Sequence, residues 1–168
     1  MEVISNKPVG RILISNDDGI DSIGITILCE IATALCDDIW IIAPSENRSG
    51  ASRSITLRRD VVIEEIAPKT FRCSGTPSDC IIFGMAEILD HAPDLVLTGI
   101  NHGMNVADDI LYSGTVAGAM EASFLACQRL HYRNVMAAKT RLIMPQAAFM
   151  VNRLSAIFWI WGSRRAPL

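Results

Sequence analysis

The first forty residues combine two kinds of apolar pattern. "GRILIS" (10–15) and "IWIIAP" (39–44) are short, nearly unbroken apolar runs, which is typical of strands that are buried on both faces. Between them, "IGITILCEIATAL" (23–35) repeats its apolar residues at helical spacing, at Ile23, Ile27, Leu28, Ile31 and Leu35. A strand, a helix and a second strand in so short a stretch predict a βαβ unit, and therefore a parallel sheet with a right-handed crossover.

Further short apolar runs follow this unit. "VVIEEI" (61–66) and "FRC" (71–73) predict a small antiparallel excursion, and "DLVLTG" (94–99) predicts another buried strand.

Two more helices are predicted on either side of that buried strand. The sequence Thr76-Pro77 with Asp79 in the first turn is a helix start for 75–89, and "SGTVAGAMEASFLA" (113–126) is a helix of small residues that can lie close to a sheet. Together with the strands they predict an α/β fold, a Rossmann-like three-layer sandwich with a mainly parallel sheet.

Three polar loops each follow a predicted strand: "NDDG" (16–19), "SENRSG" (45–50) and "GINHG" (99–103). Because the carboxyl ends of parallel strands lie on one edge of a sheet, we expect the three loops to gather there. The candidate chemistry of the chain is therefore predicted at this edge.

The most informative of these loops carries two adjacent carboxylates, Asp17 and Asp18. Two like charges side by side repel each other, and a cation near them reverses that cost. Ser49 and Asn101 add oxygen donors from the other two loops, and oxygen ligands without His or Cys favour magnesium, manganese or calcium. The alternative is that "NDDG" is only a turn, since Asn, Asp and Gly are the usual turn residues.

"YSGT" supplies a second candidate feature at a helix start. The hydroxyls of Ser113 and Thr115, with backbone N–H groups around Gly114, can hold a phosphate. Alternatively, Ser113 merely caps the helix. His102, Asp108, Asp109, Arg48 and Arg53 are weaker candidates, the first three for proton transfer and the arginines for phosphate contact.

Composition narrows the class of protein. Half of the 168 residues are hydrophobic and 20% are charged, which describes a folded domain with a real core. The five cysteines include no CxxC pair, so we expect a reducing, cytoplasmic setting and buried thiols such as Cys73 and Cys80. The N-terminus has no signal-peptide pattern, and no uncharged apolar run reaches the roughly 20 residues of a spanning helix.

The motifs "ISNDDGI", "IAPSENRSGAS", "CSGTPSDC", "PDLVLTGINHGMN" and "DDILYSGTVAGAMEA" resemble the SurE family of metal-dependent nucleotidases, over about residues 11–127. The resemblance implies a 5'-nucleotidase or acid phosphatase that forms a homodimer or homotetramer. It implies a catalytic pair, Asp17 and Asp18, and one Mg²⁺ or Mn²⁺ held by Asp17, Asp18, Ser49 and Asn101. It also implies a phosphate pocket lined by Asn16, Gly75, Ser113, Gly114 and Thr115.

The resemblance stops where the charge pattern changes. Residues 1–121 hold all 18 acidic residues and 8 basic ones, whereas residues 122–168 hold 7 basic residues and no acidic one. We therefore divide the chain into a SurE-like Rossmann nucleotidase domain, 1–127, and an atypical basic tail, 128–168, in place of the family's oligomerisation region.

Three explanations of the tail are open. We favour a shifted reading frame or another truncated replacement. A divergent end that forms an apolar helix over 144–161 is the second. A basic segment that touches membrane or nucleic acid is the third, and the scatter of the basic residues makes it weak. We expect lower stability and impaired oligomerisation relative to full-length relatives.

The leading hypothesis is an enzyme that hydrolyses nucleoside 5'- and 3'-monophosphates to nucleoside and phosphate, without a nucleic-acid or membrane partner. The alternative is a catalytically impaired remnant that only binds metal or nucleotide. A dinucleotide-binding module is disfavoured, because the first βα turn carries two acids where a pyrophosphate site needs glycines.

Overall fold

A computed structural model describes residues 7–136, 148–151 and 157–162, with side chains described as far as Ala126. Its strands are β1 (Ile12–Ser15), β2 (Ile39–Pro44), β3 (Ile63–Ala67), β4 (Thr70–Cys73), β5 (Leu95–Thr98), β6 (Ala148–Val151) and β7 (Ile157–Gly162). Its helices are α1 (Ile23–Thr33), α2 (Pro77–Phe83), the π-helical turn η1 (Gly84–Ile88), α3 (Asp109–Tyr112) and α4 (Gly114–Met136).

The strands form one sheet in the order β3-β4-β2-β1-β5-β7-β6. β1 runs parallel to β2 and to β5, and β2 runs parallel to β4. The pairs β3–β4, β5–β7 and β6–β7 are antiparallel, so a parallel centre is flanked by antiparallel strands at both edges. This confirms the α/β sandwich with a Rossmann-like parallel centre, as well as the antiparallel excursion.

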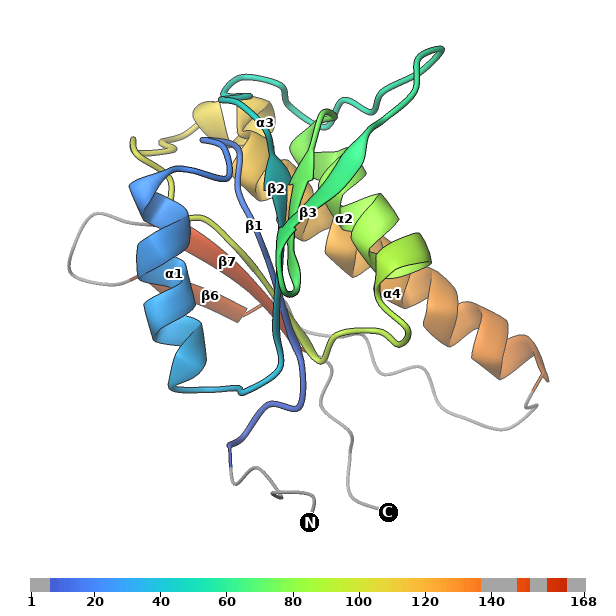
Figure 1. The fold of residues 1–168 in the computed structure, drawn as a ribbon. Helices are drawn as coiled ribbons and strands as arrows, with labels where there is room; N and C mark the ends of the chain where they lie inside the picture. The colour runs from blue at the N-terminus through green and yellow to red at the C-terminus, as the bar shows by residue number, and fades with distance from the viewer. Residues whose placement is uncertain (1–6, 137–147, 152–156, 163–168) are drawn as a thin grey trace.

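Helices cover both faces of the sheet (Figure 1). On one face, Ile25 and Leu28 of α1 pack with Ile12 and Ile14 of β1. On the other face, Leu13 packs in a second cluster with residues of α2 and α4, which include Ile81 and Ala122. Because successive side chains of a strand point to opposite faces, the short run "ILIS" supplies both cores. The buried Cys73 and Cys80 belong to the second cluster, which confirms their prediction as core residues.

Two helix boundaries differ from the predicted ones. The predicted helix 75–89 consists of α2 followed by η1. Gly84 lies at their junction and packs closely on β2, since a Cβ at this position would lie 2.7 Å from Ile42 Cδ1. The helix predicted over 113–126 begins at Gly114 and continues to Met136, because nothing in the local pattern marks an end at Ala126. Among the described helices, none is long and apolar enough to cross a membrane.

The helical explanation of the tail is wrong for its described parts. Segments 148–151 and 157–162 are strands, and β7 pairs with β5, with Trp161 opposite Val96. "IFWIWG" is rich in β-branched and aromatic residues, which favour a strand over a helix. The remaining parts of the helix predicted over 144–161, residues 144–147 and 152–156, lie outside what the structure describes.

Candidate active site

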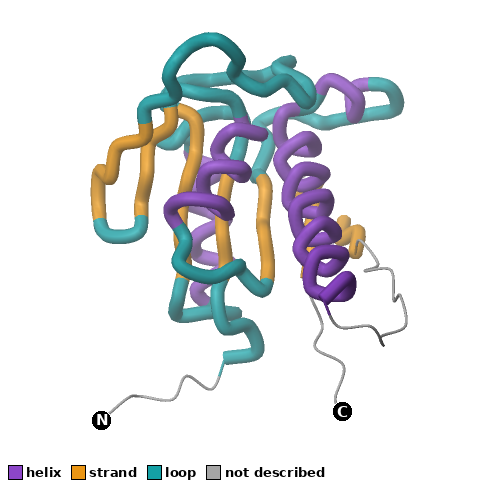
Figure 2. The backbone as a smooth tube through the Cα atoms, turned by 90° about the vertical axis from the view of Figure 1, so that its right-hand side faces the viewer, coloured by secondary structure: helices purple, strands orange, loops and turns teal. Residues whose placement is uncertain are grey.

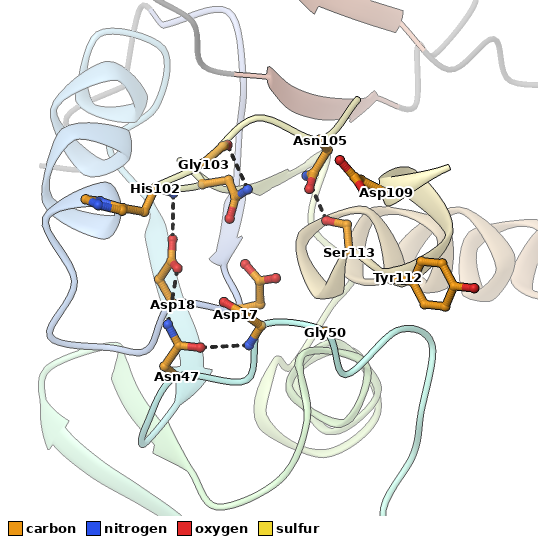
Figure 3. Close-up of a pocket in the computed structure, with 12 residues that line it drawn as sticks. Asp17, Asp18, Asn47, Gly50, His102, Gly103, Asn105, Asp109, Tyr112 and Ser113 are labelled. Carbon is orange, nitrogen blue, oxygen red and sulfur yellow. Dashed lines mark hydrogen bonds between the residues drawn. The ribbon is translucent and has the colours of Figure 1, made fainter. Parts of the chain in front are cut away.

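The three polar loops meet at the carboxyl edge of the sheet, as predicted. This is the end where loops gather at the top of Figure 2. Together with the segment before α4 they enclose a pocket of about 350 Å³. The pocket is lined by Asp17, Asp18, Asn47, Ser49, Gly50, Asn101, His102, Gly103, Asn105, Asp109, Tyr112 and Ser113. Figure 3 shows these residues around the pocket, contributed by different parts of the chain, with the rings of His102 and Tyr112 directed away from Asp17.

Asp17 lies at the back of this pocket and is 3% exposed. The Thr115 hydroxyl donates a hydrogen bond of 2.5 Å to its Oδ1. The start of α4 lies directly against it, since a Cβ on Gly114 would come within 2.7 Å of Asp17 Cβ. Only glycine allows the helix to begin this close to the carboxylate.

Asp18 is more exposed than Asp17 and joins the other two loops. Its Oδ2 accepts a hydrogen bond of 2.9 Å from the backbone N–H of His102, and its Oδ1 accepts one of 3.4 Å from Asn47 Nδ2. Burial raises the pKa of Asp18, and the neighbouring charge of Asp17 adds to this, while the His102 N–H opposes it. Two ionised carboxylates side by side are therefore electrostatically unfavourable here. A bound cation would offset the repulsion between them.

Ser49 and Asn101 complete the predicted ligand set, and all four residues line the one pocket. The Ser49 backbone N–H donates to Asn47 Oδ1 at 2.8 Å, and Asn101 Nδ2 donates to the Gly103 carbonyl at 2.9 Å. Because the amide nitrogen of Asn101 is engaged in that bond, Oδ1 is the atom of this side chain that could ligate an ion. Within the described residues, no group of three or more His, Cys, Asp or Glu could hold a metal ion. The donor set of two carboxylates and neutral oxygens instead fits a hard ion such as Mg²⁺ or Mn²⁺.

Ser113 lines the pocket at the start of α4. Its Oγ accepts hydrogen bonds from Asn105 Nδ2 at 2.9 Å and from the Val116 N–H at 3.2 Å. The hydroxyl thus caps the helix, as one alternative predicted, and it also faces the pocket. Gly114 and Thr115 follow it directly, but the Thr115 side chain is fully buried and bonds to Asp17.

Of the five residues expected around a phosphate, Ser113 lines the pocket, whereas Asn16, Gly75, Gly114 and Thr115 lie outside its lining. Asn16 closes the "NDDG" turn: its Nδ2 donates to the Gly19 carbonyl at 3.0 Å and to Ser22 Oγ at 2.7 Å, and its Oδ1 accepts from the Gly19 N–H at 3.2 Å. Gly75 packs on the start of α2, where a Cβ would lie 2.5 Å from Asp79 Oδ2.

Of the weaker candidates, only His102 and Asp109 line the pocket. Arg48 donates to the Ser74 carbonyl at 3.2 Å and pairs with Glu46 at 2.9 Å. Arg53 pairs with Glu121 of α4 at 3.0 Å. Both arginines therefore stabilise the loop after β2 and do not line the pocket.

Sequence reasoning missed Asn47, Asn105 and Tyr112. Asn47 contacts Asp18, Asn105 contacts Ser113, and Tyr112 lines the pocket beside them. Each lies in or next to a segment that was singled out, "SENRSG", "NHGMN" or "YSGT", so proximity to those motifs was the available signal.

The sequence also matches a known protein family. Residues 12–156 match the family model described as "Survival protein SurE". The chain belongs to the SurE family. The matched region extends past Cys127, where the sequence motifs end.

Relatives of known name support the assignment. A "5'-nucleotidase SurE" of Methylorubrum extorquens (strain PA1) is 52% identical over 121 residues, which cover 71% of this chain and 48% of the relative. One of Vibrio campbellii is 50% identical over 133 residues, 79% of this chain and 51% of the relative. The chain thus spans about half the length of the curated relatives it matches.

A solved structure shares the fold. The crystal structure of the SurE protein from Aquifex aeolicus aligns with a TM-score of 0.65 and 26% sequence identity, over 90% of this chain and 82% of that chain.

Proposed function

We propose that this chain hydrolyses nucleoside 5'- and 3'-monophosphates to nucleoside and inorganic phosphate, with one Mg²⁺ or Mn²⁺ as cofactor. One observation carries the proposal: four oxygen-bearing residues from three separate loops, Asp17, Asp18, Ser49 and Asn101, line one pocket beside the start of α4. The names of the relatives support the substrate class. Cytoplasmic location is part of the same proposal, as is action on free nucleotides without a nucleic-acid or membrane partner. The homodimer or homotetramer implied by the family also belongs to it, and we expect that assembly to be impaired here.

The phosphate has a natural place at the α4 end of the pocket. The N–H groups of the first turn of any helix lack partners within the helix, and the helix dipole favours an anion there. The Ser113 hydroxyl and the backbone N–H groups of Gly114 and Thr115 would hold phosphoryl oxygens in this position. Such fixed donors stabilise the charge that develops on the transferring group.

The carboxylate end of the pocket would hold the ion. When bound, a divalent ion supplies neutralisation of the phosphate charge and polarisation of the attacking water. Asp17 and Asp18 provide the negative charge that retains it, and Ser49 and Asn101 provide neutral oxygens. His102 and Asp109 also line the pocket and are the groups able to accept a proton from water.

The test is phosphate release from 5'-AMP, 3'-AMP and p-nitrophenyl phosphate by the purified chain, with Mn²⁺ or with EDTA. We expect EDTA to abolish release and Asp17→Asn to lower it at least about 100-fold with the fold intact by circular dichroism. Asp21→Asn is the matched control, since this acid is 81% exposed on the next turn and outside the pocket. Equal rates for Asp17→Asn and wild type would overturn the proposal. Manganese binding without phosphate release by the wild type would favour the binding-only alternative.

A further inference from the structure

The buried hydroxyl of Thr115 has an unusual partner. Thr115 is 0% exposed and Asp17 is 3% exposed, and their side chains meet across 98 positions of the chain. The hydrogen bond from Thr115 Oγ1 to Asp17 Oδ1 measures 2.5 Å. It joins the loop after β1 to the first turn of α4, so it links the carboxylate and helix ends of the pocket.

The same carboxylate is confined by packing. A Cβ on Gly114 would lie 2.7 Å from Asp17 Cβ, 3.0 Å from Asp17 Oδ2 and 3.0 Å from Pro77 Cγ. The start of α4 therefore closes on one side of Asp17, and Pro77 of α2 packs against the same glycine, while Thr115 binds one oxygen of Asp17. Within the described part of the chain, no hydrogen bond to Oδ2 is found, which leaves this oxygen as the available ligand atom.

The donor type matters as much as its position. A lysine or arginine at this place would compete with a cation for the carboxylate, because its own charge would neutralise Asp17. A hydroxyl donates one hydrogen bond and carries no charge, so it orients the carboxylate and leaves its negative charge for an ion. Residues that hold a metal ligand by hydrogen bonding generally determine how well that ligand binds.

We propose that Thr115 is a positioning residue, which fixes the Asp17 carboxylate through Oδ1 so that Oδ2 is presented to a divalent ion in the pocket. This inference rests on the proposed function, because it assigns Thr115 a role toward the ion of that site. It also assigns different roles to the two hydroxyls of "YSGT". Ser113 lines the pocket, whereas the Thr115 hydroxyl donates its hydrogen bond to Asp17.

The test measures manganese affinity by isothermal titration calorimetry, independently of activity. Thr115→Val removes the hydroxyl at nearly constant volume, and we expect the Kd for Mn²⁺ to rise about 10- to 100-fold. Thr115→Ser keeps the donor and should recover most of the affinity. Recovery by serine distinguishes orientation of Asp17 from simple filling of space, since serine has the hydroxyl but lacks the methyl group.

Thr98→Val is the matched control, because this hydroxyl is equally buried, lies outside the pocket lining and has no hydrogen-bond partner among the described residues. We expect the Kd of this variant for Mn²⁺ to equal that of the wild type.

If Thr115→Val fails to melt cooperatively, the comparison of Thr115→Ala with Thr115→Ser replaces it. Equal affinity of the serine variant and the variants without a hydroxyl would overturn the role of Thr115 alone. Absence of Mn²⁺ binding by the wild type would overturn the proposed function and this role together.

Discussion

The two neighbouring aspartates, Asp17 and Asp18, differ in burial and in hydrogen-bond partners. Asp17 is buried and is held by Thr115 of α4. Asp18 is half-buried and accepts hydrogen bonds from Asn47 and the His102 N–H, on the loops after β2 and β5. One carboxylate thus anchors the pocket to the helix layer, and the other joins its two flanking loops. The two adjacent aspartates therefore connect all four segments of the site: their own loop after β1, the loops after β2 and β5, and the start of α4.

Another buried carboxylate, Asp79, lies outside the pocket and holds a loop beside it. It is 3% exposed and accepts hydrogen bonds from the Thr76 N–H at 2.8 Å and from Thr56 Oγ1 at 2.6 Å, and the Thr56 N–H adds one of 3.1 Å. The bonds tie the long loop after β2 to the first turn of α2. Asp79→Ala leaves these donors without their acceptor, so we expect the free energy of unfolding to fall by about 2–4 kcal/mol in urea denaturation.

Asp60→Ala is the control for this variant, because Asp60 is an exposed acid in the same loop after β2. A surface substitution of this kind changes stability by no more than about 0.5 kcal/mol. A loss for Asp79→Ala as small as that of Asp60→Ala would show that the Asp79 hydrogen bonds contribute nothing net.

Individual elements explain how the distant loops are brought to one place. Gly24 in α1 touches the loop after β5: its carbonyl accepts from the Ile100 N–H at 3.3 Å, and a Cβ there would lie only 2.1 Å from the Ile100 carbonyl oxygen. That loop carries Asn101 and His102 into the pocket. The close approach of α1 therefore sets the position of two pocket residues.

Gly24→Ala tests this contact. The added methyl group collides with backbone, which has no flexible end to move aside, so the helix and the loop must separate. We expect a loss of about 1–3 kcal/mol in stability and a weaker Mn²⁺ affinity, measured by urea denaturation and calorimetry. Thr26→Ala, an exposed change in the same helix, should leave both nearly unchanged. Wild-type affinity in Gly24→Ala would rule out this account of how the loop is placed.

Elements with strong local patterns were predictable from sequence, and their long-range pairing was not. Neighbouring residues alone are enough to predict the apolar runs of β1, β2 and β5 and the helical spacing of α1. Nothing near 70–73 indicates that β4 also pairs in parallel with β2. The same holds for the site. Its candidate ligands could be found because each lies in a loop that follows a strand: Asp17, Asp18, Ser49 and Asn101. The contacts of Thr115 with Asp17 and of Asn105 with Ser113 depend on tertiary packing and could not.

At the scale of the whole molecule, the sheet has two chemically different ends. The pocket lies at the carboxyl end of the parallel strands, and a cluster of charges lies at the other end. Arg11, just before β1, donates to Asp38 Oδ2 at 2.5 Å and to Asp90, and its guanidinium lies 5.3 Å from the centre of the Trp40 ring. Lys69 pairs with Asp38 at 2.7 Å. This cluster joins the starts of β1, β2 and β4 to the segment before β5.

The charge cluster predicts how the stability of the molecule depends on pH. Burial opposes ionisation of Asp38, but hydrogen bonds from Lys69 and Arg11 outweigh it and lower its pKa. The hydrogen bond from Arg11 lowers the pKa of Asp90 to about 2. A carboxyl whose pKa is lower in the folded than in the unfolded state stabilises the fold above its unfolded pKa, and this stabilisation is lost as pH falls through the folded pKa. For Asp90 the loss falls between about pH 4 and pH 2, and Asp38, whose pKa is also lowered, adds to it below about pH 4.

The double variant Asp38→Asn/Asp90→Asn removes both titrations and should flatten the fall in unfolding free energy across this window. Urea denaturation of both proteins at several pH values between about 5 and 2 measures the two slopes. Asp108→Asn is the control, since it removes one exposed acid at the opposite end of the sheet and should leave the slope of the wild type. If the double variant lost stability as steeply as the wild type, the acid sensitivity would originate elsewhere. A flattened slope with unchanged Mn²⁺ affinity at neutral pH would show that the two ends of the sheet act independently, since the pocket shares none of these residues.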